Sequence, residues 1–554
     1  MLKPKLFTTL KNYTREQFIK DSFAGIVVGI VALPLSIAFA IASGVSPEKG
    51  LITAVVGGFL ISALGGSRVA IGGPTGAFVV IIYGIVQQYG LNGLMIATIM
   101  AGIILIILGV SGFGSTIKFI PHPIIVGFTS GIAVIIFSSQ IKDFFGLQMG
   151  NVPSEFFDKW KEFALNFSNF NFYALAISSA SLLIIIFLQK FYHKIPAPIF
   201  VIIISTFVVQ YFQLPVETIG SRFGKISSMI PSPTMPLFDF EIIKNLLRPA
   251  TTIAILAGIE SLLACVVADG MIGSKHRSNM ELVAQGVANI ASPLFGGIPA
   301  TTAIVRTATN IRSGGRTPIA GIIHSITLLL IMLLFGRWAS LIPLSTLAAI
   351  LVIVAYNMSE WKTFLSLMRS PRSDVIVLIT TFFLTVVVDL VVAIEIGMVL
   401  AVFLFMKRMS EVTNIGIVTR ELKDGEEVED SNATENNLIP KGVEVFEING
   451  PFFFGAVEKF KEVMNYVEDL PKVRIIRMRN VNAIDATGLH TIREVFHSSK
   501  KQGCQIILSE VHSQPVFAFT KSGIFDEIGE ANFHGNFDDA LTRAKEVLSL
   551  GKIK

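Results

Sequence analysis

The fold follows from the stretch Gly296-Gly-Ile-Pro-Ala-Thr-Thr-Ala-Ile-Val-Arg306, which has a near-echo upstream in Gly72-Gly-Pro-Thr-Gly-Ala77. Each stretch places a Gly-Gly pair and a proline inside hydrophobic sequence, followed by small residues that favour the start of a short helix. Inside hydrocarbon every backbone N–H and C=O must be paired, so irregular backbone survives there only when it is buried in protein or lines a wet cavity. Two interrupted spans at corresponding places therefore predict a ligand site between two halves of a membrane protein.

Composition places the chain among polytopic membrane proteins. Hydrophobic residues make up 52% of its 554 residues and charged residues only 15%, and it contains 44 phenylalanines, a far more apolar balance than that of soluble domains. The two cysteines, Cys265 and Cys504, lie in regions of opposite character and offer no disulfide or metal-site spacing. We therefore expect no metal and no cofactor.

Charge is distributed unevenly along the chain. Residues 1–410 are basic and residues 411–554 are acidic, so the basic balance reflects membrane topology and predicts no nucleic-acid partner. Residues 1–20 are polar and lead into an apolar run without a small-residue cleavage site, which indicates a cytoplasmic lead-in and not a signal peptide. Basic residues of most later loops fall on the same side as this lead-in. Both termini are thus expected in the cytoplasm, with the chain spanning a plasma or bacterial inner membrane.

Residues 21–410 contain the hydrophobic segments. About fourteen segments of helical length are present, several of them shorter than the roughly 20 residues of a full span. Seven spans in each half is an odd number, so the second half must be inverted relative to the first. The sequence predicts a polytopic α-helical membrane protein built as seven-plus-seven inverted repeats. The expected segments lie near 22–42, 50–65, 74–88, 92–111, 121–141, 172–189, 196–213, 250–268, 280–294, 301–311, 317–335, 343–357, 374–388 and 390–406.

An internal repeat supports the two halves. The offset that carries Gly72 onto Gly296 also carries Ser36, in the first span, onto Glu260, in the eighth. The alternative to an internal repeat is that glycine and proline match by chance in apolar sequence.

The repeat predicts a specific geometry at the two interruptions. Extended pieces at 69–73 and 295–299 are expected to pair with each other. The helices that begin near Thr75 and Thr301 would then direct their N-terminal N–H groups at one place near the membrane midplane. Two positive helix ends together favour an anion.

Two ionisable residues fall inside the spans near this place. Glu260 is the only ionisable carboxyl of its span, and Arg306 lies on the short helix. A charge at bilayer depth costs on the order of 3 kcal/mol or more unless it faces a cavity or a partner. A structural ion pair between the two is the alternative. His324, without a second ligand nearby, is typical of a hydrogen-bonded core histidine. The expected substrate-binding residues are Ser36, Thr75, Gly76, Ala77, Ala300, Thr301, Thr302 and Arg306, with Glu260 in proton coupling.

Composition changes sharply after Arg408. Residues 411–440 form an acidic, polar linker, and residues 441–554 form a separate domain. Alternating strands and helices in this domain indicate a small α/β fold with a mostly parallel sheet. The strands are expected at 443–448, 473–478 and 505–508, and the helices at 455–467 and 487–500.

Five motifs are spread over the hydrophobic part of the chain: Gly44-Val-Ser-Pro-Glu-Lys-Gly-Leu51, Gly65-Gly-Ser-Arg68 with Gly73-Pro74, Gly127-Phe-Thr-Ser-Gly131, Ile259-Glu-Ser-Leu-Leu263 and Arg312-Ser-Gly-Gly-Arg-Thr317. They resemble those of the sulfate permease, or solute carrier 26, family of anion transporters, and the resemblance covers nearly the whole chain. The resemblance implies a core domain of spans 1–4 and 8–11 that moves against a gate domain of spans 5–7 and 12–14. It also implies a substrate site between the half-helices of spans 3 and 10, and a homodimer in the lipid membrane.

The segment Val481-Asn-Ala-Ile-Asp-Ala-Thr-Gly-Leu489 resembles the loop of the sulfate transporter and anti-sigma factor antagonist (STAS) fold. In the soluble antagonists the position matching Thr487 is a phosphorylated hydroxyl, so Asp485 and Thr487 are candidate regulatory residues. The alternative is a plain helix cap, with the Thr487 hydroxyl as the cap and Asp485 stabilising the same turn. This domain is also the candidate contact for a cytoplasmic protein partner.

Two shorter segments, 141–149 and 357–360, resemble the proton-driven C4-dicarboxylate transporters of enteric bacteria. Cyanobacterial bicarbonate carriers that use sodium have an Asp at the position of Glu260 and lack the arginine. The combination of Glu260 with Arg306 favours protons over sodium, because desolvation in an apolar span favours the protonated carboxyl. Sulfate, bicarbonate and C4-dicarboxylates all stay open as substrates.

Three function classes are open to a chain of this organisation. The first is a secondary active anion transporter, a proton-coupled symporter working by alternating access. The second, a nucleobase permease of the same inverted-repeat fold, would need neither Arg306 nor a STAS domain. The third, a membrane-anchored STAS signalling protein, would need far fewer spans. The sequence has no nucleotide loop, metal cluster or nucleophile-base pair, so we expect no enzyme.

Overall fold

The computed structural model describes residues 2–115, 121–150, 152–153, 155–191, 196–224, 229, 231–237, 240–388, 390–412, 414–417, 439–465 and 470–550. The chain divides into two compact units, residues 1–399 and 400–554. Most of the expected acidic linker, 411–440, lies outside the described residues.

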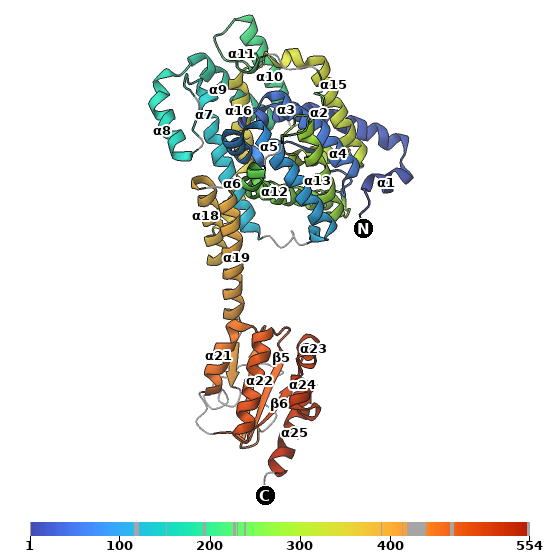
Figure 1. Ribbon diagram of the computed structural model, residues 1–554, viewed down its shortest axis with the longest axis vertical. Coiled ribbons are helices and arrows are strands. Elements are labelled where there is room, and N and C mark those ends of the chain that lie inside the picture. The colour runs from blue at the N-terminus through green and yellow to red at the C-terminus, as the bar shows by residue number, and fades with distance from the viewer. Residues whose placement is uncertain are drawn as a thin grey trace. The chain divides into compact units, whose positions relative to one another are not determined.

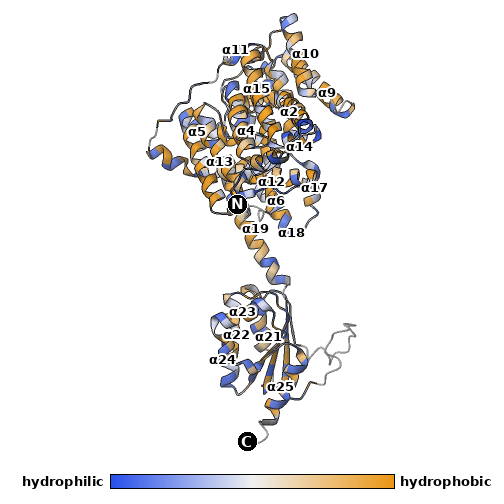
Figure 2. Cartoon of the chain, turned by 90° about the vertical axis from the view of Figure 1, so that its right-hand side faces the viewer, coloured by the Kyte–Doolittle hydropathy of each residue, from blue (hydrophilic) through white to orange (hydrophobic). Residues whose placement is uncertain are grey.

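The first unit is a bundle of helices around a short two-stranded ribbon (Figure 1). Each of the fourteen expected segments coincides with a helix, and among the described residues eight helices are long and apolar enough to cross a membrane. Figure 2 shows hydrophobic residues dominating this unit, as the composition predicts. The helices of these segments are α2 (Arg15–Ala42), α3 (Pro47–Ile52) with η2 (Thr53–Gly57) and α4 (Gly58–Leu64), α5 (Val79–Val110), α6 (His122–Ser139), α9 (Phe172–Phe191), α10 (Ala197–Tyr211), α12 (Phe240–Ile272), α13 (Ser278–Leu294), α14 (Ile304–Arg312), α15 (Pro318–Ala339), α16 (Leu344–Met358), α18 (Arg372–Val387) and α19 (Leu390–Val412).

Shorter elements complete the first unit. Helix α5 covers two expected segments, which are two helices joined at a kink where Gly90 has non-helical backbone, with φ 66° and ψ −169°. The lead-in helix α1 precedes α2, whose N-cap Thr14 accepts a hydrogen bond from the N–H of Gln17. The remaining short elements are α1 (Lys5–Thr9), η1 (Leu10–Asn12), η3 (Gly76–Phe78), α7 (Ile141–Phe145), α8 (Phe156–Asn166), η5 (Phe167–Asn169), α11 (Ile219–Phe223) and α17 (Trp361–Leu367).

The two halves repeat one order of elements: long helix, helix, strand, short helix, long helix. In the first half these are α2, α3 to α4, β1 (Gly72–Gly73), η3 and α5, and in the second α12, α13, β2 (Thr301–Thr302), α14 and α15. Their packing is reciprocal, since α2 packs on α15 as α12 packs on α5, and α4 packs on α15 as α13 packs on α5. Two repeats related by a twofold axis bury each other's apolar faces in this way.

The predicted start of the second short helix is wrong. Thr301 lies in β2, and α14 begins at Ile304; the predicted extended piece 295–299 precedes the strand. The reason is that Gly296, with φ +81°, turns the chain at the end of α13, where its N–H donates to the carbonyl of Pro293. In the first half the Gly-Gly pair is itself the strand, so the two interruptions are not aligned residue for residue.

A second group of helices packs together apart from the repeat core. Helix α6 packs on α16 and α18, and α9 packs on α7, α10 and α16. These helices correspond to expected spans 5–7, 12 and 13, so the grouping agrees with a core and a gate.

The second unit is an α/β domain with a five-stranded sheet in the order β3-β4-β5-β6-β7. Strand β3 is antiparallel to β4, and the others are parallel to their neighbours. Apolar side chains alternate between the faces, with Val445 and Ile475 toward α25 and Phe446 and Ile476 toward α21 to α24. The elements are β3 (Asn414–Ile417), β4 (Val443–Asn449), α21 (Phe454–Asn465), β5 (Val473–Asn480), α22 (Ala486–Lys501), β6 (Gln505–Ser509), α23 (Ser513–Ser522), α24 (Ile524–Ile528), η7 (Glu530–Asn532), β7 (Phe533–His534) and α25 (Phe537–Leu550).

Candidate functional site

The β1–β2 ribbon brings the two interrupted spans together. Gly72 pairs with Thr302 and Gly73 with Thr301 in an antiparallel register. The Ala303 N–H extends the pairing to the carbonyl of Ile71 at 3.0 Å. Because both strands are paired in this way, the backbone groups that face the partner strand are hydrogen-bonded although all four strand residues are buried. The short elements η3 and α14 begin just after the ribbon, one from each half.

The Arg306 guanidinium lies buried against this ribbon, with its side chain 2% exposed. Its Nη2 donates to the carbonyl of Pro74 at 2.9 Å and to the Ser36 hydroxyl at 3.3 Å. Its Nη1 has no hydrogen-bond partner in the described part of the chain. A Cβ on Gly73, whose φ is +152°, would lie 2.2 Å from Nη1, so the close approach requires glycine there. A buried cationic donor without a partner is costly, which makes this atom a candidate anion ligand.

Glu260 is the second charged residue near the ribbon. Its Oε2 accepts a hydrogen bond from the Thr75 hydroxyl at 2.9 Å, and its side chain is partly buried. No ion pair within the described residues joins Glu260 to Arg306, which disfavours the structural-pair alternative. The two charged side chains instead bind adjacent residues. Glu260 accepts a hydrogen bond from the Thr75 hydroxyl, and Arg306 donates one to the carbonyl of Pro74.

The other predicted substrate-binding residues are packed around this point. Ser36, Gly76, Ala77, Ala300, Thr301 and Thr302 are all buried. The Thr301 hydroxyl donates to the carbonyl of Ala257 at 2.9 Å, and the backbone of Ala300 is held by Asn289 through two hydrogen bonds. A Cβ on Gly76 would lie 2.7 Å from the Met358 sulfur on α16, so this position is where the core meets the gate helices.

A buried polar cluster that sequence analysis missed supports the ribbon from behind. Glu281 is fully buried, and its Oε1 accepts hydrogen bonds from Ser261, Gln285 and Thr302 at 3.0 to 3.2 Å. Its Oε2 accepts from the N–H groups of Gly66 and Ser67 at 2.8 and 3.2 Å. The signal was present in the sequence, because Glu281, Gln285 and Asn289 recur every four residues on one face of α13.

Replacing Glu281 with alanine should lower the free energy of unfolding by about 3 to 5 kcal/mol, because five donors would lose a buried charged acceptor. Glu281→Gln should have an intermediate effect. Its amide keeps one acceptor oxygen, but its NH₂ group would face donors that need an acceptor. Thermal unfolding of the purified protein in detergent measures both. An alanine variant within about 0.5 kcal/mol of wild type would contradict this role, since surface substitutions stay in that range.

His324 departs from the expected hydrogen-bonded core histidine. Its ring is fully buried in α15, and neither ring nitrogen has a hydrogen-bond partner in the part of the chain that the structure describes. The prediction of a satisfied core histidine is therefore wrong, and the close packing of α15 on α2, where a Cβ on Gly29 would lie 3.2 Å from the His324 carbonyl, accounts for the burial of this position.

In the second unit, Asp485 is the N-cap of α22. Its carboxylate accepts hydrogen bonds from the N–H of Gly488 at 2.8 Å and of Phe454 at 3.1 Å. Thr487 is an exposed residue of the first turn. The alternative in which the Thr487 hydroxyl caps the helix is therefore wrong, because the Asp485 side chain already occupies that position.

Asp485→Ala should destabilise the start of α22 by about 1 kcal/mol, the usual cost of losing an N-cap. Thr487→Ala, its matched control two residues away, should be neutral. Hydrogen exchange of the first turn of α22 in the full-length protein measures the difference. Equal effects of the two variants would contradict the capping assignment.

Comparison with known proteins places this architecture in a family. Residues 18–381 match the sulfate permease family, and residues 436–540 match the STAS domain. "Putative sulfate transporter YvdB" of Bacillus subtilis is 41% identical over 535 residues, covering 96% of this chain and 98% of that protein. "Bicarbonate transporter BicA" of a Picosynechococcus strain is 30% identical and covers 81% of each.

Solved structures agree with the fold. The murine solute carrier 26 family member A9 anion transporter in the inward-facing state superposes with a TM-score of 0.88 at 18% identity, covering 98% of this chain and 94% of that one. The transmembrane domain of a cyanobacterial BicA superposes with a TM-score of 0.62 at 28% identity, covering 70% of this chain and 98% of that one. The predicted polytopic helical fold with a C-terminal α/β STAS domain is thus confirmed. The nucleobase-permease and anchored-signalling alternatives are set aside. The chain therefore belongs to the sulfate permease family of multi-pass membrane proteins, and it is a secondary anion transporter with a STAS domain and not an enzyme.

Proposed function

We propose that the transported anion binds between the starts of η3 and α14, with Arg306 as its principal ligand. The observation that carries this proposal is the buried guanidinium whose Nη1 has no partner among the described residues. The two short helical starts add positive dipole ends to the same place. Ser36, Thr75, Gly76 and Ala77 would surround the anion, while Ala300, Thr301 and Thr302 shape the site through the ribbon.

We propose proton-coupled symport, with Glu260 as the proton acceptor. Glu260 accepts a hydrogen bond from Thr75, which precedes the helical start at Gly76. A proton on Glu260 would remove a negative charge close to the incoming anion, so binding of the two would be cooperative. Sodium coupling is the second candidate, and a gradient experiment separates the two.

Transport would follow an alternating-access cycle in which the repeat core moves against the gate helices. The contact between Gly76 and Met358 lies on the boundary that such a motion would cross. Sulfate and bicarbonate are candidate substrates because relatives bear those names. C4-dicarboxylates are a further candidate through the resemblance of segments 141–149 and 357–360.

We also propose an oligomeric state and a membrane orientation for the chain. We place residues 21–410 in a plasma or inner membrane as a homodimer, with both termini, the linker 411–440 and the STAS domain 441–554 in the cytoplasm. Asp485 and the exposed Thr487 make the start of α22 a candidate regulatory surface, where phosphate at Thr487 would add negative charge at a helix N-terminus. A cytoplasmic protein could bind there.

Uptake of labelled sulfate, bicarbonate and succinate into proteoliposomes tests the proposal. We expect accumulation of at least one anion under an inward proton gradient and none of uracil. Accumulation that follows a sodium gradient at constant pH would overturn the proton coupling. Absence of uptake for every anion, in protein that is folded and reconstituted, would overturn the assigned function.

A further inference from the structure

A cavity of about 710 Å³ lies beside the core rather than at the Arg306 site. Its walls come from the end of α2, the first half of α5, α6 to α8, α11 and the end of α18. Val79 and Val80, the first residues of α5 after η3, line it. The cavity thus reaches the helix that opens at the proposed anion site, between the repeat core and the gate helices.

Three cationic side chains line this cavity, and two of them are already engaged. Arg222 forms an ion pair with Asp143 at 2.8 Å and contacts Glu217. Lys142 donates to the carbonyls of Met149 and Gly150 at 3.1 and 2.9 Å, so it is hydrogen-bonded but its charge is not neutralised. The third cation that lines the cavity is Lys159.

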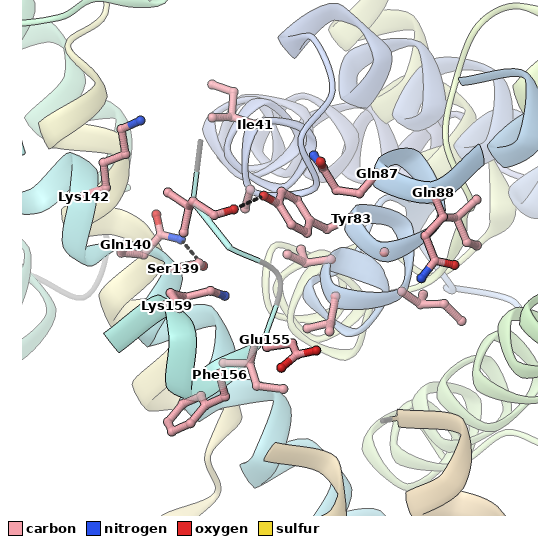
Figure 3. A pocket seen from close by; sticks show the side chains of 18 of the residues that line it. Ile41, Tyr83, Gln87, Gln88, Ser139, Gln140, Lys142, Glu155, Phe156 and Lys159 are labelled. Carbon is pink, nitrogen blue, oxygen red and sulfur yellow. Dashed lines mark hydrogen bonds between the residues drawn. The ribbon is translucent and has the colours of Figure 1, made fainter. Parts of the chain in front are cut away.

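Lys159 lies on α8 and is 5% exposed, and its side-chain amine has no hydrogen-bond or ion-pair partner in the described part of the chain. Figure 3 shows its amine directed into the cavity, near Ser139 and Gln140. Glu155 also lines the cavity but forms no ion pair with Lys159 among the described residues. Burial lowers the pKa of Lys159, and a bound anion would offset that cost.

We propose that this cavity is a second anion site, a vestibule in which Lys159 holds a small oxyanion such as sulfate or a carboxylate on its way to or from Arg306. Lys142 adds a second positive charge, and Gln87 supplies an amide on the opposite wall, whereas the Tyr83 hydroxyl already donates to the carbonyl of Val152 at 2.8 Å. The transport role rests on the proposed function, whereas binding in the cavity does not depend on it. A cation in a partly desolvated cavity raises the local concentration of anions and speeds their capture.

Sulfate uptake at graded concentrations tests the transport role. Lys159→Gln should raise the half-saturating concentration about tenfold, the scale of a lost charge-assisted hydrogen bond, and leave the maximal rate within about twofold. Lys161→Gln, an exposed position of the same helix, is the matched control and should change nothing. Lys159→Arg should restore the wild-type value. An unchanged half-saturating concentration in Lys159→Gln, or an equal rise in the control, would overturn the transport role.

Thiol protection tests binding without transport. Gln88→Cys, exposed on the cavity wall, is placed in protein whose two cysteines are replaced by alanine, and it is labelled with an anionic methanethiosulfonate. Sulfate should slow the labelling, and Lys159→Gln should abolish that protection while Arg306→Gln should not. Protection by sulfate without anion uptake would contradict the proposed function but support the second anion site. Anion uptake without Lys159-dependent protection would support the proposed function but overturn the second anion site.

Discussion

Arg306→Gln is expected to reduce anion uptake by about 100-fold or more. The guanidinium is the one charged donor at the junction of the two interrupted spans within the described residues, and a hydrogen bond to a charged group is worth about 1.5 to 3 kcal/mol. Since each 1.4 kcal/mol is tenfold in affinity, loss of one such contact together with its charge reaches about two orders of magnitude. Initial rates of sulfate or bicarbonate uptake into proteoliposomes measure it.

Arg312→Gln is the matched control, because Arg312 lies on the same helix and is exposed. It should transport normally. Thermal unfolding in detergent should show both variants folded, so that lost uptake reports on binding and not on folding. Uptake by Arg306→Gln within threefold of wild type would remove Arg306 from the site.

Glu260→Gln is expected to abolish accumulation driven by a pH gradient while retaining exchange of anion across the membrane. The amide has nearly the same size and can still accept the Thr75 hydroxyl, but it cannot take up and release a proton. Wild-type accumulation should rise as the outside is made more acidic than the inside, because a proton and the anion then enter together. In the variant, anion accumulation should stay equally low whether the outside is at the same pH as the inside or more acidic.

Glu260→Asp serves as the control, since it keeps a titratable carboxyl and should keep some pH-driven accumulation. Counterflow of labelled against unlabelled anion at equal pH measures exchange separately. Unchanged accumulation by Glu260→Gln would exclude the coupling role. A variant that lost both accumulation and counterflow would instead assign Glu260 to binding or to folding.

Local sequence was sufficient for the long membrane helices and for the central strands of the second unit. Long apolar runs can be stable in a membrane only as helices, and all fourteen expected segments coincide with helices. In the second unit, β4, β5 and β6 lie at the predicted strands, because period-two apolar residues must face two layers of helices. Strands β3 and β7 were missed, since each has four residues or fewer and carries little pattern.

Local sequence was less reliable where one residue competes with another for the same partner. Asp485 and Thr487 are both good capping residues, and only the backbone conformation decides that Asp485 accepts the N–H of Gly488. The Gly-Gly pairs look equivalent in sequence, yet Gly296 ends a helix while Gly72 belongs to the ribbon. Gly296 donates to the carbonyl of Pro293, three residues earlier, whereas Gly72 pairs with Thr302 of the other half, a partner that a local pattern does not contain.

The sequence by itself determined the membrane class, the two interrupted spans and the two charged residues beside them, because apolar content, backbone breakers and intramembrane charges are all local properties. Only the tertiary structure decided that Glu260 and Arg306 contact adjacent residues instead of each other, that Glu281 ties five donors together behind β2, and that Lys159 is buried beside a cavity. The physical reason is that burial and hydrogen-bond partnership depend on the packing of separate segments, and those that hold Glu260, Arg306 and the backbone at Gly66 are 185 to 232 residues from their partners.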